Sequence, residues 1–212
     1  LPITIDTTAP TFTSVLRHAP SSQTTGLDAL TFRLTFSEPI SGLDSNDFAV
    51  TGSTATVSRI AMVSGTLGSY DATVSGGNLA SLNGVLGLGF VANPTVTDIA
   101  GNSLAGIVPT VSPQTYTLDN RNPVVSITSS AASLGGTGTA VITFTLDQAS
   151  NDFGVDDVAA SGGTISNFAG SGLSYTATFS PSSGFAGSAQ ISVDAGSFRN
   201  ASDVYNASSS LS

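Results

Sequence analysis

Alternation of apolar and polar residues with a period of two runs through almost the whole chain. In the segment ALTFRLTF, Leu30, Phe32, Leu34 and Phe36 fall on one face, and two threonines and an arginine fall on the other. This period indicates an antiparallel strand with one buried face, because successive side chains of a strand point to opposite sides. The same pattern occurs in VITFTL (141–146), YTATF (175–179) and AQISV (189–193).

Helical periodicity is nearly absent. Only GGNLASLNG places two apolar residues three positions apart, Leu79 and Leu82, and its flanking glycines limit it to one short turn of helix. Glycine, serine and threonine recur between the alternating segments, at intervals of roughly ten residues. Short strands separated by frequent turns predict an all-β fold of the β-sandwich class.

An internal repeat divides the chain into two copies. ITIDTTAPTF (3–12) aligns with YTLDNRNPVV (116–125), and both contain an aspartate followed four positions later by a proline. The interval between matched residues shortens along the chain, so the second copy has shorter loops. We therefore predict two homologous domains, residues 1–118 and 119–212. Further matches are NDFAVTG (46–52) with DDVAASG (156–162), and YDATVSGG (70–77) with YTATFSPS (175–182).

The composition argues against several classes of partner and site. Fourteen acidic residues outnumber five basic ones, all arginine, and the formal net charge is -9. Such a chain is repelled by phosphate backbones and anionic headgroups, so we expect no nucleic-acid partner and no membrane-surface binding. No apolar run approaches the ~20 residues of a membrane helix, so we expect no membrane insertion. The absence of cysteine excludes disulfides, thiolate zinc sites and cysteine nucleophiles.

Signatures of catalysis are weak. The single histidine, His18, lies in the loop-like segment VLRHAPSS, and no G-x-S-x-G nucleophile motif is present. A glycosidase needs two carboxylates beside a sugar groove, usually with aromatic platforms, and this chain has no tryptophan. Its phenylalanines fall mostly at strand positions expected in cores. We therefore expect that the protein is not an enzyme.

Several motifs together resemble a known family. An Asp-x-x-x-Pro start, then FSEPISGLDSNDFAVTG, YDATVSGG, VTDIAGNSL and a closing YTLDN, are similar to the tandem bacterial immunoglobulin-like repeats of large surface adhesins, of the biofilm-associated and RTX types. The second copy resembles another subtype of these repeats. The resemblance covers nearly the whole chain. It implies two tandem immunoglobulin-like β-sandwich domains in a monomeric fragment of a longer protein, which is located outside the cell or on the bacterial cell surface.

Glu38 is the only glutamate of the chain and directly precedes a proline. In an immunoglobulin-like sandwich, Asp6 at the start of the domain, Glu38 after the second strand, and Asp98 and Asn102 in DIAGN would meet at one pole. Converging carboxylates repel each other unless a cation neutralises them. Calcium accepts carboxylate and amide oxygens, so we predict a calcium site of Asp6, Glu38 and Asp98, assisted by Asn102.

The family resemblance supports this calcium site, because such repeats bind calcium near domain junctions. The alternative is structural. Asp6 and Asp98 would then stabilise turns, and Glu38 would be solvated.

The corresponding pole of the second copy departs from this pattern. Gln148 stands at the position of Glu38, and Asn200 stands at the position of Asp98. Fewer formal charges predict weaker calcium binding, or a pole held by amide hydrogen bonds and packing. The candidate ligands at this pole are Asp119, Asn122, Asp147 and Asp203. Five further acids lie in short acidic stretches that we interpret as turn formers rather than ligands, namely Asp44, Asp47, Asp152, Asp156 and Asp157.

Two functional hypotheses follow. In the first, the chain is a non-catalytic stalk or spacer of a large bacterial adhesin, stiffened by calcium, with neighbouring immunoglobulin-like repeats as partners and a host-cell, biofilm or glycan ligand. The chain has no lysine, so a lysine-asparagine isopeptide bond cannot supply the rigidity. In the second, the chain is an accessory module of a secreted enzyme that binds a glycan or a protein. A sugar-binding face needs clustered rings, whereas the tyrosines are scattered at Tyr70, Tyr116, Tyr175 and Tyr205.

Overall fold

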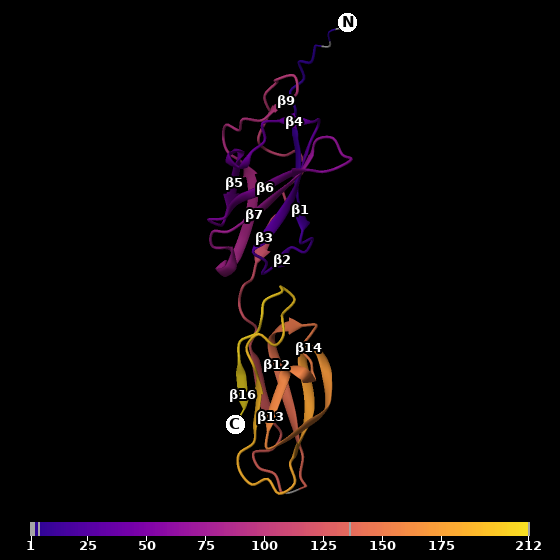
Figure 1. Cartoon of the computed structure of the whole chain (residues 1–212), viewed down its shortest axis with the longest axis vertical. Coiled ribbons are helices and arrows are strands. Elements are labelled where there is room, and N and C mark those ends of the chain that lie inside the picture. Colours follow the sequence, from indigo (N-terminus) through magenta and orange to yellow (C-terminus); the bar gives the residue numbers. More distant parts are fainter. Residues whose placement is uncertain (1–2, 4, 136, 212) are drawn as a thin grey trace. The chain divides into compact units, whose positions relative to one another are not determined.

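The computed structural model describes residue 3, residues 5–135 and residues 137–211. The chain divides into two compact units, Leu1–Asn120 and Arg121–Ser212 (Figure 1). The described residues contain strands and three single-turn 3-10 helices but no α-helix, as predicted, and none of these helices is long and apolar enough to cross a membrane. The short helices are η1 (Ser45–Asp47), η2 (Leu79–Ser81), which is the turn predicted in GGNLASLNG, and η3 (Val155–Asp157).

The first unit is a sandwich of two four-stranded sheets. One sheet has the order β1-β3-β7-β6 and the other β2-β10-β8-β5, and every pairing is antiparallel except that of β2 with β10. This order is typical of the immunoglobulin-like fold. The strands of the first sheet are β1 (Phe12–Ala19), β3 (Ala29–Phe36), β7 (Ser69–Ser75) and β6 (Thr56–Met62). Those of the second are β2 (Thr24–Thr25), β10 (Tyr116–Leu118), β8 (Gly84–Phe90) and β5 (Phe48–Thr51).

The core of the first unit follows from the alternation in β3. Leu30, Phe32, Leu34 and Phe36 are all buried, whereas the threonines between them are only partly covered. Their apolar surface leaves water against rings of the opposite sheet, which is the main force that holds such a sandwich together. The ring of Phe36 lies 6.1 Å from that of Phe90 in β8.

The outer face of the first sheet carries a polar cluster. Arg33 donates two hydrogen bonds to the Asp71 carboxylate, at 2.8 and 2.9 Å, and this partner lowers the pKa of Asp71. His18 belongs to strand β1, so its expected place in a loop is wrong. Its Nε2 atom lies 2.9 Å from Arg33 Nη2, and because arginine can only donate, His18 accepts through this nitrogen.

The second unit is a smaller sandwich with two three-stranded sheets, of order β11-β12-β14 and β13-β15-β16. Strand β14 turns back on itself near Gly170 and Gly172, which have positive φ, so that Gly163 near its start lies against Ser180 near its end. The predicted inward residues of β12, β14 and β15 are buried, among them Phe144, Tyr175 and Val193. The strands are β11 (Val125–Ser129), β12 (Ala140–Ser150), β13 (Val158–Ser161), β14 (Gly163–Pro181), β15 (Gln190–Val193) and β16 (Ser209–Leu211).

Candidate metal centre

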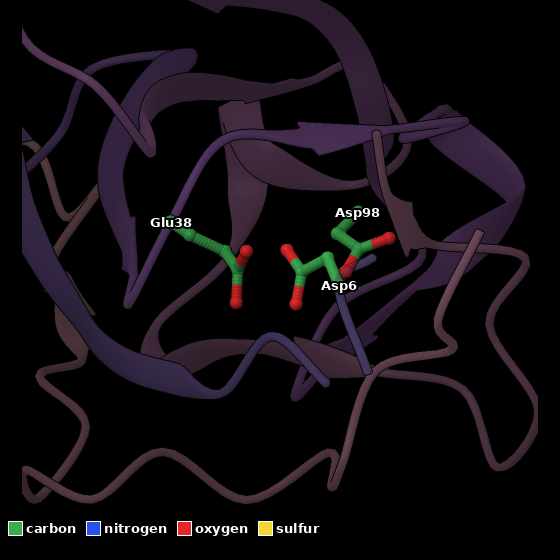
Figure 2. A group of neighbouring side chains, drawn as sticks. All are labelled: Asp6, Glu38 and Asp98. Carbon is green, nitrogen blue, oxygen red and sulfur yellow. The ribbon is translucent and has the colours of Figure 1, made fainter. Parts of the chain in front are cut away.

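Three carboxylates from distant parts of the sequence meet at one end of the first unit. One ligand oxygen from each of Asp6, Glu38 and Asp98 lies within 4.8 Å of the other two (Figure 2). Asp6 precedes β1, Glu38 lies between β3 and β4 (Ile40–Ser41), and Asp98 ends β9 (Thr97–Asp98). Asp98 is buried, Glu38 is partly buried and Asp6 is exposed, so the group opens to solvent on one side.

A short two-stranded sheet fixes the segments that carry Glu38 and Asp98. Ile40 in β4 is paired with Asp98 in β9. The Tyr70 hydroxyl donates to the Ile40 carbonyl oxygen at 3.0 Å and accepts a hydrogen bond from the Ile40 nitrogen at 3.2 Å. This tyrosine therefore ties β4 to β7. Its role was missed in the sequence, where it was weighed only as a ring for sugar binding.

Gly68 allows the backbone of Glu38 to come close to the loop that precedes β7. Gly68 has a φ of +72°, in the left-handed region, and a Cβ atom there would lie 2.8 Å from the Glu38 carbonyl oxygen. The Phe36 nitrogen donates to the Gly68 carbonyl oxygen at 2.8 Å. Any side chain at position 68 would push Glu38 away from its present place.

Asn102 acts as a hydrogen-bond donor at this pole. Its backbone nitrogen donates to Asp98 Oδ1 and its Nδ2 donates to Asp98 Oδ2, both at 2.8 Å. The same Nδ2 atom lies 3.2 Å from the Asp6 carbonyl oxygen. Asn102 therefore orients Asp98 and connects it to Asp6. The predicted assistance to the site takes the form of positioning, with the amide nitrogen directed at the acids.

The charges of the three acids affect each other. Burial raises the pKa of Glu38, and the negative charges of Asp6 and Asp98 raise it further. Burial alone would also raise the pKa of Asp98, but hydrogen bonds from Asn102 and from the backbone of Gly101 and Ala100 outweigh it and lower that pKa. The carboxylate of Asp98 is thus readily ionised, whereas that of Glu38 beside it favours a proton or a cation.

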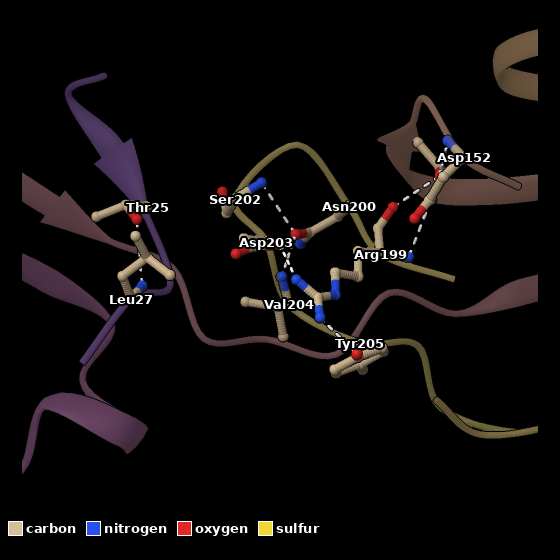
Figure 3. Close-up of polar contacts among 10 residues, drawn as sticks. Thr25, Leu27, Asp152, Arg199, Asn200, Ser202, Asp203, Val204 and Tyr205 are labelled. Carbon is tan, nitrogen blue, oxygen red and sulfur yellow. Dashed lines mark hydrogen bonds and ion pairs between the residues drawn. The ribbon is translucent and has the colours of Figure 1, made fainter. Parts of the chain in front are cut away.

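The equivalent pole of the second unit is built from amides. Asn200 Nδ2 donates to Gln148 Oε1 at 2.7 Å. Asn200 Oδ1 accepts from the backbone nitrogens of Ser202 and Val204, as Asp98 Oδ1 accepts from Asn102 (Figure 3). A direct hydrogen bond therefore joins the two positions that are carboxylates in the first unit.

The other candidate ligands of the second pole have protein partners. Asp147 Oδ1 accepts from the Val124 nitrogen at 2.7 Å, and Asn122 Nδ2 donates to the Tyr205 carbonyl oxygen at 2.8 Å. Asp203 forms an ion pair with Arg199, whose pKa is raised by its bonds to Tyr205 and Asp203. Asp119 lies in the first unit, directly after β10, and its backbone nitrogen donates to Thr25. Within the described part of the chain, these candidates form no cluster comparable to that of the first unit.

The model of one protein family, described as the bacterial Ig-like domain, matches residues 6–115 and again residues 119–212. The chain belongs to the bacterial Ig-like domain family. A comparison with curated protein sequences gave no match. Among solved structures, the N-terminal part of the bacterial S-layer protein SbsC is similar over 97% of this chain and 44% of that chain, at 15% identity and a TM-score of 0.33. The present chain thus spans less than half of that structure.

Two acids outside the two poles of these Ig-like domains, Asp47 and Asp157, support turns through hydrogen bonds to the backbone. Asp47 is buried in the first domain and accepts hydrogen bonds from the Thr95 nitrogen at 2.6 Å and the Asp44 nitrogen at 2.8 Å. Asp157 accepts from the Gly154 nitrogen at 2.8 Å in the second domain. Each of these two carboxylates stabilises the single-turn helix that it ends.

Proposed function

We propose that this chain is a pair of non-catalytic spacer repeats from a bacterial surface or secreted adhesin, and that the first repeat binds calcium through Asp6, Glu38 and Asp98. The observation that carries the proposal is the difference between the two poles. Where the second domain has a hydrogen-bonded amide pair, the first has carboxylates that cannot donate to each other while ionised.

The donor set favours calcium over other cations. All three side chains offer carboxylate oxygens, which suit hard cations rather than zinc or copper. They lie on irregular segments and open to solvent, so backbone carbonyls and water can complete the roughly six to eight oxygen ligands of calcium. Magnesium requires a stricter octahedral geometry and retains more of its water.

The surfaces of the two domains favour a spacer over a glycan-binding module. Tyr70, Tyr116 and Tyr175 are buried in the cores, and the exposed large aromatic residues in the described part of the chain are Phe185 and Tyr205. The ring of Tyr205 already packs against Arg199, whose guanidinium carbon lies 4.3 Å from the ring centroid. Membership of the bacterial Ig-like family is consistent with a structural module at the cell surface.

Thermal unfolding with calcium and with chelator tests the calcium site. At a calcium concentration about 100 times the dissociation constant, binding stabilises the folded domain by about 2.7 kcal/mol. For a domain of this size, that raises the unfolding midpoint by roughly 10 °C. We expect Glu38→Gln to abolish most of this rise, because the substitution removes one anionic ligand and keeps the side-chain size.

Asp28→Asn is the matched control. Asp28 is an exposed acid outside the cluster, so this variant loses the same charge but keeps the three carboxylates. It should respond to calcium like the unmodified chain. A chelator that leaves every midpoint unchanged would refute the calcium proposal, and two calcium-independent Ig-like domains would remain.

A further inference from the structure

Ile3 and Ile5 are exposed, although their sequence matches that of a buried strand. Ile3 is 89% exposed and Ile5 is 82% exposed. The internal repeat aligns them with Tyr116 and Leu118 of β10, which are 0% and 1% exposed. In both copies one threonine separates the two apolar residues. The pattern of a final strand thus occurs at the beginning of this unit as well as at its end.

Strand β10 shows what this pattern does in an Ig-like domain. Tyr116 lies opposite Leu86 of β8, and Leu118 lies opposite Gly84. On its other side β10 runs parallel to β2, and the Thr117 nitrogen donates to the Gln23 carbonyl oxygen at 2.8 Å. The strand therefore completes a sheet with its backbone while it fills the core with its two apolar side chains.

The same position is occupied in both described domains. Strand β10 fills it in the first domain, and β16 fills it in the second, where it pairs with β15. Ile3 and Ile5 therefore have no sheet to complete in either domain. The N-terminal segment leaves the first domain at the end where β4 and β9 are found (Figure 1).

The residues that follow also match. Leu118 is followed by Asp119, where the second family match begins, and four residues later by Pro123. Ile5 is followed in the same way by Asp6, where the first match begins, and four residues later by Pro10. A final strand that runs directly into the Asp-x-x-x-Pro start of the next domain is thus the connection this chain already uses once.

We propose that Ile3 and Ile5 belong to the last strand of a further Ig-like domain that precedes Asp6. In that domain Ile3 and Ile5 are buried as Tyr116 and Leu118 are buried in the first domain. Isoleucine is suited to this role because β-branched side chains pack well on a pleated, half-buried sheet. The inference deepens the tandem-repeat role proposed above, and it does not depend on calcium.

An extended chain tests the inference. A second copy of residues 6–115 is placed directly before Ile3, so that this copy lacks β10 and can complete its sheet only with Ile3-Thr4-Ile5. In a reference chain, Tyr116-Thr117-Leu118 stands in place of Ile3-Thr4-Ile5. The two chains therefore differ only by isoleucine for tyrosine and isoleucine for leucine. Both are studied in chelator, so that the result does not depend on the calcium site.

We expect the added copy to fold in both chains. In the extended chain, hydrogen exchange at the Ile5 amide should slow by on the order of 100-fold relative to the 1–212 chain, because a paired strand exchanges only on opening. The added copy should unfold at a lower temperature than in the reference chain, since isoleucine lacks the Tyr116 hydroxyl that bonds to Pro20 and Thr31. Ile3→Asp with Ile5→Asp should leave the added copy unfolded.

Two outcomes would overturn the inference. One is an added copy that folds in the reference chain but stays unfolded, with rapid exchange at Ile5, in the extended chain. The other is protection of Ile5 in the 1–212 chain that grows with protein concentration, which would assign the strand to a second copy of this chain. Neither outcome affects the calcium melts, so the two proposals fail separately.

Discussion

Glu38 and Gln148 show how a change of one functional group alters the chemistry of a pole. Both lie at the position two residues before a short pairing, Ile40 with Asp98 in one domain and Ser150 with Asn200 in the other. Gln148 accepts a hydrogen bond from Asn200, and it donates through Nε2 to the Arg121 carbonyl oxygen at 3.0 Å. Glu38 faces two other acids, which raise its pKa in addition to the effect of burial.

The raised pKa of Glu38 predicts opposite effects of pH with and without calcium. Without calcium, the folded domain holds the proton of the Glu38 carboxyl group more tightly than the unfolded chain does. Glu38 therefore stabilises the fold below its ordinary pKa, and this contribution is lost as pH rises through the raised pKa. Calcium competes with the same proton. The apparent calcium affinity, measured by isothermal titration, should therefore fall as the pH is lowered through the raised pKa of Glu38.

Asp98 works in the other direction in the absence of calcium. Its lowered pKa stabilises the fold above the ordinary aspartate value, and this contribution is lost as pH falls through the folded value. The pH effect on calcium affinity should be much smaller in Glu38→Gln than in the unmodified chain. Equal pH dependence in both would show that Glu38 does not exchange its proton for the ion.

At the scale of elements, β4 and β9 hold Glu38 and Asp98 in place, and Tyr70 anchors β4. Tyr70→Phe removes the hydroxyl that both donates to and accepts from Ile40. Loss of these bonds should destabilise the first domain by about 1–2 kcal/mol and weaken calcium binding. Chemical denaturation gives the first quantity, and isothermal titration gives the second.

Tyr116→Phe provides the matched control for this substitution. Its hydroxyl bonds to the Pro20 and Thr31 carbonyl oxygens, at 2.8 and 2.9 Å, and neither residue belongs to the acidic cluster. It should lower stability to a similar extent while calcium affinity stays unchanged. If both variants weaken binding equally, Tyr70 affects the site only through general stability.

The elements that the sequence predicts well are those with a strong period. Strand β3 has the bounds of the ALTFRLTF segment, and β12 and β15 bury the residues expected. Strands β4 and β9 have two residues each, too few for any period to appear, and they form through pairing with each other. The part played by Tyr70 depends on a contact between residues 30 positions apart, which no local pattern encodes.

The candidate site was also predictable from the sequence only in part. The grouping of Asp6, Glu38 and Asp98 was predictable because the fold class brings their loops to one pole. The direction of the Asn102 amide was not, since it depends on which atoms surround it after folding. His18 was expected in a loop because the segment VLRHAPSS looks loop-like, yet β1 extends through Ala19.

At the scale of the molecule, the two domains form an internal comparison, and exchanging their poles tests it. Glu38→Gln, Asp98→Asn and Asn102→Val together give the first domain the residues found at Gln148, Asn200 and Val204. We expect this variant to fold without calcium and to lose the calcium-dependent rise in midpoint, because the new amides can bond as Asn200 bonds to Gln148. Differential scanning calorimetry with calcium and with chelator measures both effects.

The reverse exchange, Gln148→Glu with Asn200→Asp, replaces a hydrogen bond by two like charges. In chelator it should lower the midpoint of the second domain and leave that of the first domain unchanged. If the first domain still gains stability from calcium after Glu38, Asp98 and Asn102 have been exchanged, the ion binds away from these three residues.

The connection between Asp6 and Asn102 bears on how the first domain responds to mechanical tension. A pull on the chain before Asp6 reaches the domain where the Asp6 carbonyl oxygen accepts from Asn102, ahead of the first residue pair of β1. With an ion bound to all three acids, that force is shared among the leading segment, the loop after β3 and the end of β9. The calcium concentration around the protein would then set the force at which the domain begins to unravel.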